Sequence, residues 1–131
     1  MRALLDTSVL IGEAPPTDVE AAISVVSLTE LHFGALVAND EDERARRIDR
    51  LTAIEATFDP LPVTAEVARA WGRLASAVTR RGGNPRRRHL DLAIAATAIA
   101  EKVPLLTYDL SDLRIISDLV DARQPKFAQD R

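Results

Sequence analysis

Cysteine is absent from this chain of 131 residues, and histidine occurs only twice, as His32 and His89. The absence of thiols excludes disulfides, thiolate metal sites and cysteine nucleophiles. With so few imidazoles, any bound metal ion must be held mainly by oxygen, which favours Mg²⁺ or Mn²⁺ over Zn²⁺. The candidate metal ligands are therefore carboxylates.

Long apolar runs are also missing, because none approaches the ~18 residues that a membrane span requires. The N-terminal segment Met1–Asp6 carries one positive side chain but reaches an acid too soon for a secretory signal. We therefore expect a cytoplasmic protein with no membrane segment.

Charge and length narrow the class of protein further. The net charge of −3 argues against binding nucleic acid through the whole surface, although it leaves room for a local basic patch. A chain of 131 residues, of which 47% are hydrophobic, fits one domain over residues 1–131 with a single site. Residues 124–131, with Pro125 and mixed charges, are expected to form a loosely ordered tail.

Short apolar segments alternate with helical patterns along the chain. This alternation predicts a three-layer α/β fold with a mostly parallel central sheet. We expect strands over residues 2–5, 22–26, a segment ending near Val63, and 103–107. Helices are expected over 28–38, from about 39 onward, from Thr64 to the glycine pair at 82–83, and over 90–101, with an extended stretch after Pro85.

Asp91 is the most informative acid, because it lies in a segment, residues 90–100, that is apolar on nearly every face of a helix. Such a helix is buried. An ionised carboxylate there is costly unless it is paired, well hydrogen-bonded or bound to a metal. The alternative is an aspartate that only stabilises the N-terminus of its helix.

Three more acids follow predicted strands. Asp6 ends the first strand, and Asp109 and Asp112 follow the last one. Open α/β sheets place their sites at the carboxyl ends of strands, so these acids are expected to face one crevice. Like charges gathered there repel one another, and a divalent cation removes that repulsion. Taken singly, each is also a plausible turn residue.

Glu30 has a simpler explanation. Ser27-x-x-Glu30 has the form of a capping box at the start of a helix, which accounts for Glu30 without a metal.

A basic segment lies just before the helix that carries Asp91. Arginine binds phosphates through a planar fork, and glycines allow a loop to approach a backbone closely. The adjacency to Asp91 favours a role in substrate binding over a solvated loop or arginines paired with nearby acids. The segment contains Arg80, Arg81, Gly82, Gly83, Arg86, Arg87 and Arg88.

Four motifs in this order resemble PIN-domain ribonucleases, and specifically the VapC-type toxins of type II toxin–antitoxin pairs. The resemblance runs from Leu4 to about Val120. The motifs are Leu4-Leu5-Asp6-Thr7-Ser8-Val9-Leu10-Ile11, Ser24-Val25-Val26-Ser27-Leu28-Thr29-Glu30-Leu31-His32-Phe33-Gly34, residues 84–98, and Leu106-Thr107-Tyr108-Asp109-Leu110-Ser111-Asp112-Leu113.

The resemblance implies a parallel sheet flanked by helices and near-invariant acids at Asp6, Glu30 and Asp91. For the fourth acid it leaves two candidates: Asp112 aligns with the acid of the family, whereas Asp109 replaces an asparagine and is itself a potential ligand. Both are kept.

On this basis we expect an endoribonuclease in which Mg²⁺ or Mn²⁺, held by these carboxylates, activates a water molecule against an RNA phosphodiester. Thr7 or Ser8 and Thr107 are expected to hold water at the metal, and Arg86, Arg87 and Arg88 to position the RNA backbone. The resemblance also implies a homodimer that is silenced by a small VapB-like antitoxin whose C-terminal segment covers the active site.

Other classes of protein place acids at strand ends. A phosphoacceptor receiver domain needs a lysine after a late strand, and Lys126 follows no predicted strand. A haloacid-dehalogenase-like phosphatase needs a second acid two residues after its nucleophile, where this chain has Ser8. A catalytically inactive PIN-like RNA-binding module is a third alternative, which the retention of every acid disfavours.

Overall fold

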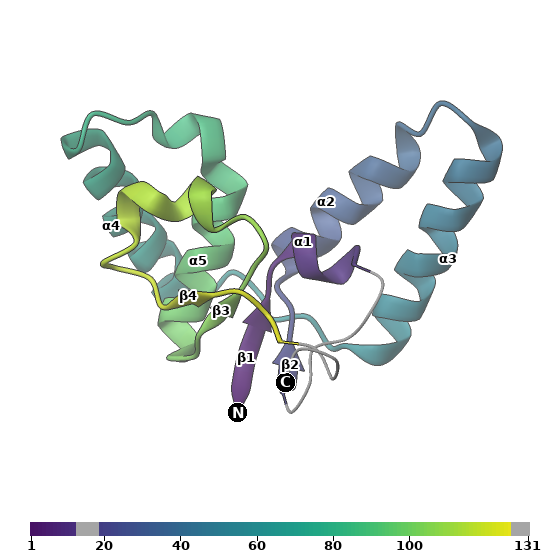
Figure 1. Cartoon of the computed structure of the whole chain (residues 1–131), viewed down its shortest axis with the longest axis horizontal. Helices are drawn as coiled ribbons and strands as arrows, with labels where there is room; N and C mark the ends of the chain where they lie inside the picture. Colours follow the sequence, from purple (N-terminus) through teal and green to yellow (C-terminus); the bar gives the residue numbers. More distant parts are fainter. Residues whose placement is uncertain (13–18, 127–131) are drawn as a thin grey trace.

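The computed structural model describes residues 1–12 and 19–126 of the chain. Its centre is a parallel sheet of four strands in the order β2-β1-β3-β4 (Figure 1). Because the strands are parallel, their carboxyl ends lie at one edge of the sheet. The strands are β1 (Arg2–Leu5), β2 (Glu20–Ala22), β3 (Leu105–Leu106) and β4 (Ala122–Arg123).

Helices connect the strands. Within the described residues, none of them is both long and apolar enough to cross a membrane. They are α1 (Thr7–Leu10), α2 (Val25–Leu36), α3 (Glu41–Thr57), α4 (Ala65–Arg80) and α5 (His89–Glu101), with two 3₁₀ helices, η1 (Pro85–Arg88) and η2 (Leu110–Ile116).

Strand β1 is buried on both faces, as its apolar sequence predicts. Leu4 points into a core formed with α4, α5 and η2, whereas Ala3 and Leu5 point into a second core shared with α1, α2 and α3. Figure 1 shows these two groups of helices on opposite sides of the sheet. The predicted three-layer α/β fold is therefore confirmed.

Helix α5 passes through the middle of the larger core. Every residue from Leu92 to Ala98 is buried, which confirms the prediction from its apolar sequence. Alanines on α4 and α5, such as Ala70 and Ala93, line this contact and are almost fully buried. Small side chains let the two helices approach closely, and burial of the larger apolar side chains around them stabilises the layer.

Three local predictions were wrong. The second strand ends at Ala22, and α2 begins at Val25 with Ser24 as its N-cap, so Ser27 lies inside the helix. Near Val63 there is only a single bridge, between Ser24 and Leu61. Pro85 starts the 3₁₀ helix η1 instead of an extended stretch, because proline is well accommodated in the first turn of a helix.

The C-terminal segment was predicted to be a loose tail over residues 124–131. Strand β4, which the sequence did not predict, comes directly before it, and Pro125 is buried. The remainder of the predicted tail, residues 127–131, lies outside the described residues.

Candidate active site

Asp6 lies where β1 ends, and only 6% of its surface is exposed. It is the N-cap residue of α1, but its side chain caps no backbone group. Instead, its Oδ2 accepts hydrogen bonds of 2.8 Å from the hydroxyls of both Ser8 and Thr107. The two neutral donors hold a buried carboxylate at the carboxyl edge of the sheet.

The same hydroxyls join β1 to the segment after β3. Thr107 Oγ1 accepts a hydrogen bond of 2.9 Å from the backbone N–H of Asp109, and Ser8 Oγ accepts one of 3.0 Å from that of Tyr108. Each hydroxyl therefore donates to Asp6 and accepts from the loop. Ser8 and Thr107 therefore fix the positions of both Asp6 and the loop that carries Asp109.

Glu30 lies in the middle of α2, on the side that faces Asp6. Its Oε1 accepts a hydrogen bond of 2.7 Å from the Thr7 hydroxyl. Burial raises the pKa of Glu30, the bond from Thr7 lowers it, and the charge of Asp6 raises it again. The predicted capping box is absent, because α2 starts three residues earlier than expected, at Val25, with Ser24 as its N-cap instead of Ser27.

Ser27 belongs to this network and was missed as a site residue. Its hydroxyl is fully buried and lies 3.0 Å from Thr7 Oγ1. In the sequence, Ser27 was interpreted as the N-cap of the helix, because the start of the helix was predicted three residues too late. Its position one turn before Glu30 on α2 is what brings it to the site.

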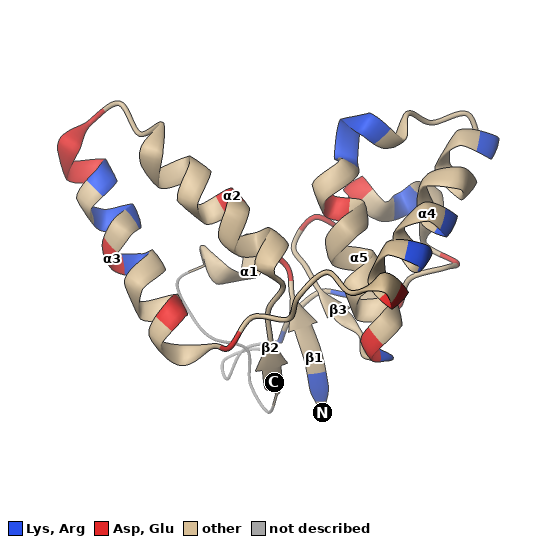
Figure 2. Ribbon diagram, turned by 180° about the vertical axis from the view of Figure 1, so that it is seen from behind, with Lys and Arg blue, Asp and Glu red and all other residues tan. Residues whose placement is uncertain are grey.

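Asp91 is the third residue of α5 and enters the site from the other side of the sheet. The pKa of Asp91 is raised to about 6. Burial is the largest cause, the negative charges of Asp6, Glu30 and Asp112 raise the pKa further, and the positive charge of Arg88 lowers it. Repulsion from three other acids shows that these carboxylates share one electrostatic environment. Figure 2 shows the acidic positions of α2 and α5 on the two sides of the carboxyl end of β1.

Asp109 and Asp112 both reach the site. Burial raises the pKa of Asp109, and Asp6 and Asp112 add to the rise. Asp112 Oδ2 lies 2.9 Å from Nη1 of Arg88, which is also 3.8 Å from Asp91 Oδ2. A small pocket is lined by Asp6, Asp91, Leu105, Thr107, Asp109, Asp112 and Leu113. The structure thus brings together all the acids singled out from the sequence.

The basic segment is placed by the end of α4. Gly82 has φ of +86°, and the N–H of Gly83 bonds the carbonyl of Val78, which ends the helix with a sharp turn. A Cβ on Gly83 would lie 2.8 Å from Ile115 Cδ1 and 2.9 Å from Val78 Cγ1, so these side chains would have to shift for any other residue. The turn leads directly into η1 and its arginines.

The arginines of η1 do not all behave alike. All three are exposed, but Arg88 also makes the ion pairs with Asp112 and Asp91 described above. His89 bonds the carbonyl of Arg86 through Nδ1 and lies with Glu30 along a second small pocket. The pairing with acids that sequence analysis offered as an alternative therefore holds for Arg88.

The donors at this site are carboxylate and hydroxyl oxygens, the ligands that a hard divalent cation prefers. As the side chains stand, no three acids or histidines among the described residues are arranged to hold a metal ion. Arg88 supplies the positive charge that faces Asp112. The chemistry of the site thus fits Mg²⁺ or Mn²⁺, and the carboxylates are gathered without forming a coordination shell.

Comparison with known proteins agrees with this fold. Ribonuclease VapC4 of Mycobacterium tuberculosis is 39% identical over 115 residues, covering 82% of this chain and 86% of the relative. Ribonuclease VapC5 of the same organism is 36% identical over 113 residues, covering 81% and 82%.

Among solved structures, VapBC-5 from M. tuberculosis, described as a toxin–antitoxin system, superposes with a TM-score of 0.80 at 33% identity, covering 96% of this chain and 98% of that one. VapBC-1 from nontypeable Haemophilus influenzae, at 18% identity and a TM-score of 0.74 over 95% of this chain and 98% of that one, shares the fold. The PIN domain model matches residues 3–117, and the chain belongs to the PIN domain family.

Proposed function

We propose that this protein is a metal-dependent endoribonuclease that acts in the cytoplasm as the toxin of a toxin–antitoxin pair. The observation that carries the proposal is the group of acids at the carboxyl edge of the sheet, where burial, together with repulsion from the neighbouring acids, raises the pKa of Asp91 to about 6. Such a group is unfavourable without a cation, which is typical of a functional site. The names of the relatives, Ribonuclease VapC4 and VapC5, support RNA as the substrate.

Mg²⁺, or Mn²⁺ in its place, would be held by Asp6, Glu30, Asp91 and either or both of Asp109 and Asp112. When bound, the cation supplies the Lewis acidity that activates water for attack on a phosphodiester and offsets charge on the phosphoryl oxygens. No protein nucleophile is needed, in agreement with the absence of cysteine.

The other polar residues orient this chemistry. Ser8 and Thr107 fix the Asp6 carboxylate through the bonds of 2.8 Å, and Thr7 fixes Glu30. Their hydroxyls also offer acceptors to water at the site. The positions of reacting groups are decisive for rate, so removal of these bonds should slow cleavage even though the acids remain.

The arginines of η1 are proposed to hold the RNA backbone beside the acids. Arg86 and Arg87 are exposed next to the site and available to phosphates. Arg88 pairs with Asp112 in this structure. In the enzyme with substrate, an RNA phosphate would compete with the Asp112 carboxylate for the guanidinium of Arg88.

Purified protein incubated with RNA and Mg²⁺ tests the enzymatic proposal. Wild type is expected to cleave, Asp6→Asn to lose activity by at least about a hundredfold, and Asp49→Asn, an exposed acid on α3, to cleave like wild type. Equal cleavage by wild type and Asp6→Asn, or none by either at high enzyme concentration, contradicts the proposal.

A small VapB-like antitoxin and a second copy of the chain are the proposed partners. The solved relative from M. tuberculosis is a toxin–antitoxin complex, which supports an antitoxin here. Co-expression with the neighbouring open reading frame and pull-down, followed by measurement of the mass of the complex, tests both partners. A monomer that retains nothing argues against the toxin role and leaves the nuclease assay unaffected.

A further inference from the structure

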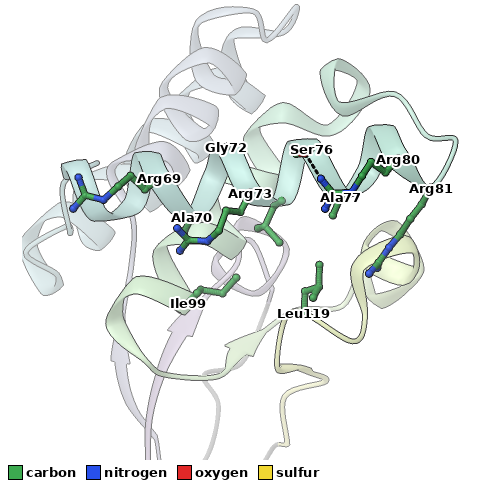
Figure 3. A pocket seen from close by; sticks show the side chains of 11 residues that line it. Arg69, Ala70, Gly72, Arg73, Ser76, Ala77, Arg80, Arg81, Ile99 and Leu119 are labelled. Carbon is green, nitrogen blue, oxygen red and sulfur yellow. Dashed lines mark hydrogen bonds between the residues drawn. The ribbon is translucent and has the colours of Figure 1, made fainter.

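One face of α4 carries a row of arginines that the active site does not use. Arg69, Arg73, Ser76 and Arg80 follow one another at positions i, i+4, i+7 and i+11, which places them along one side of the helix. They line a groove of about 680 Å³ whose other side is formed by Ile99 at the end of α5 and by Leu119 after η2 (Figure 3). We call this the α4 groove.

The positive charge of the row is not neutralised within the described part of the chain. Arg69 and Arg73 make no hydrogen bond or ion pair there, and Arg80 bonds only the hydroxyl of Ser76. Like charges one turn apart destabilise a helix. Although the protein has more acids than bases, three guanidinium groups of this row have no acid partner among residues 1–12 and 19–126.

Gly72 gives a second, independent sign that this face is kept open. It lies in the interior of α4, where glycine lowers helix stability relative to alanine. Packing does not require it, because a Cβ there would have nothing within 4 Å. Its effect is to leave the backbone of α4 accessible on the wall of the groove.

The groove is held in shape without a ligand. Arg81 donates bonds of 2.7 and 3.0 Å to the two oxygens of Asp118, and another of 2.8 Å to the carbonyl of Ile115. These bonds tie the end of α4 to the segment that carries Leu119. In Figure 3 the side chain of Arg81 points toward that segment. Arg81 therefore acts as a structural residue, unlike the three arginines of the row.

The row also leads toward the acids. The C-terminal end of α4 continues through the glycine turn into η1 and then into the first turn of α5, which carries Asp91. Arg86 and Arg87 are exposed along this path. Along the chain, the arginines of the α4 groove are thus followed by those of η1, of which Arg88 reaches the acids of the active site.

We infer that the α4 groove binds the sugar–phosphate backbone of single-stranded RNA and directs it to the carboxylates, an inference that rests on the proposed ribonuclease function. Arg69 and Arg73 are separated by a rise of about 6 Å and Arg73 and Arg80 by about 10 Å, so the three charges lie along a line that an extended polyanion can follow. Guanidinium planes and the aliphatic sides of Ile99 and Leu119 offer surfaces to unpaired bases.

Binding is measured in the Asp6→Asn background, so that the RNA stays intact, with fluorescein-labelled single-stranded RNA long enough to cover α4. The double variant Arg69→Gln/Arg73→Gln is compared with Arg2→Gln/Arg50→Gln, which removes the same charge from exposed positions on β1 and α3. Glutamine preserves helix propensity. Circular dichroism checks that both variants are folded.

The groove variant is expected to bind RNA about tenfold more weakly at about 0.15 M salt, and the slope of log K against log salt to fall by about 1.4, or about 0.7 per lost phosphate contact. The control variant should bind within about twofold of its parent, since a general change of charge has a small effect. Gly72→Leu, which fills the groove without changing charge, should also weaken binding.

Equal losses in the groove and control variants, or no loss in either, would overturn the inference. The inference would also be overturned if the protein bound poly-glutamate more tightly than RNA and the groove variant abolished that binding to poly-glutamate. The arginine row would then bind an acidic protein segment.

Activity separates this inference from the proposed function. In the wild-type background, the groove variant should raise KM for long RNA without changing kcat, and should cleave very short RNA normally. Normal kinetics of the groove variant on long RNA would refute RNA binding by the α4 groove and leave the proposed nuclease function unaffected. RNA binding that depends on the arginine row, without any cleavage by wild type, would support the role of the α4 groove and refute the proposed nuclease function.

Discussion

Removal of the Asp91 charge should stabilise the metal-free protein at neutral pH, although it removes an acid from the site. The folded-state pKa of Asp91 is raised from 3.8 to about 6 by burial and by its acidic neighbours. A rise of about two units corresponds to at most about 3 kcal/mol. The side chain is 32% exposed, so solvent screening reduces this to about 1–1.5 kcal/mol.

The sign follows from proton binding. Between about pH 4 and pH 6 the folded state holds the Asp91 proton more tightly than the unfolded state, so stability falls as the pH rises. The asparagine of the Asp91→Asn variant cannot titrate and escapes this penalty. It also loses the favourable interaction of an acid with the first turn of α5, which is worth about 0.5 kcal/mol. The net gain for Asp91→Asn is therefore about 0.5–1 kcal/mol above pH 6.

Urea denaturation of wild type and Asp91→Asn in EDTA at pH 4 and pH 7 measures the effect. Asp118→Asn is the matched control, because Arg81 lowers the pKa of that carboxyl and its removal should destabilise the protein at pH 7. The reasoning is refuted if Asp91→Asn is less stable than wild type at pH 7, or if its stability relative to wild type is the same at the two pH values.

Four further predictions concern the site, the turn after α4, helix α4 and metal binding. Thr107→Val removes the bond of 2.8 Å to Asp6 and should destabilise the protein by about 1–2 kcal/mol and slow RNA cleavage, as measured by urea denaturation and initial rates. Gly83→Ala should destabilise by about 1–3 kcal/mol, because its Cβ would meet Ile115, whereas Gly72→Ala, which meets nothing, should stabilise by about 0.5–1 kcal/mol. Mg²⁺ should raise the melting temperature of wild type and leave that of Asp6→Asn unchanged, since only an intact set of acids gains from the cation.

The sequence alone was sufficient to predict where Asp6 and Asp91 lie in the fold. An acid at the end of an apolar strand and an acid in an otherwise apolar helix are both local patterns, and the structure places them where the patterns predict. The parallel sheet followed from the alternation of strands and helices. Glu30 required resemblance, because its local pattern fitted a helix cap equally well.

Other features depend on contacts between distant residues. Ser24 and Ser27 are both good N-caps, and the valines between them favour a strand, so packing against the sheet decides where α2 begins. Strand β4 has only two residues, too few to show the alternation of apolar and polar residues that would predict a strand. The ion pair between Arg88 and Asp112 joins η1 to η2, and nothing in either segment indicates the other.

Cleavage of RNA with controlled addition of metal tests the central claim most directly. Wild type and Asp91→Asn are freed of metal with EDTA and dialysed, and RNA cleavage is then followed as Mg²⁺ is added. The account predicts that wild type is silent without Mg²⁺ and active with it, while Asp91→Asn stays at least about a hundredfold slower, despite its greater stability in EDTA. Cleavage by wild type without a divalent cation, or an Asp91→Asn variant as active as wild type, would contradict the account.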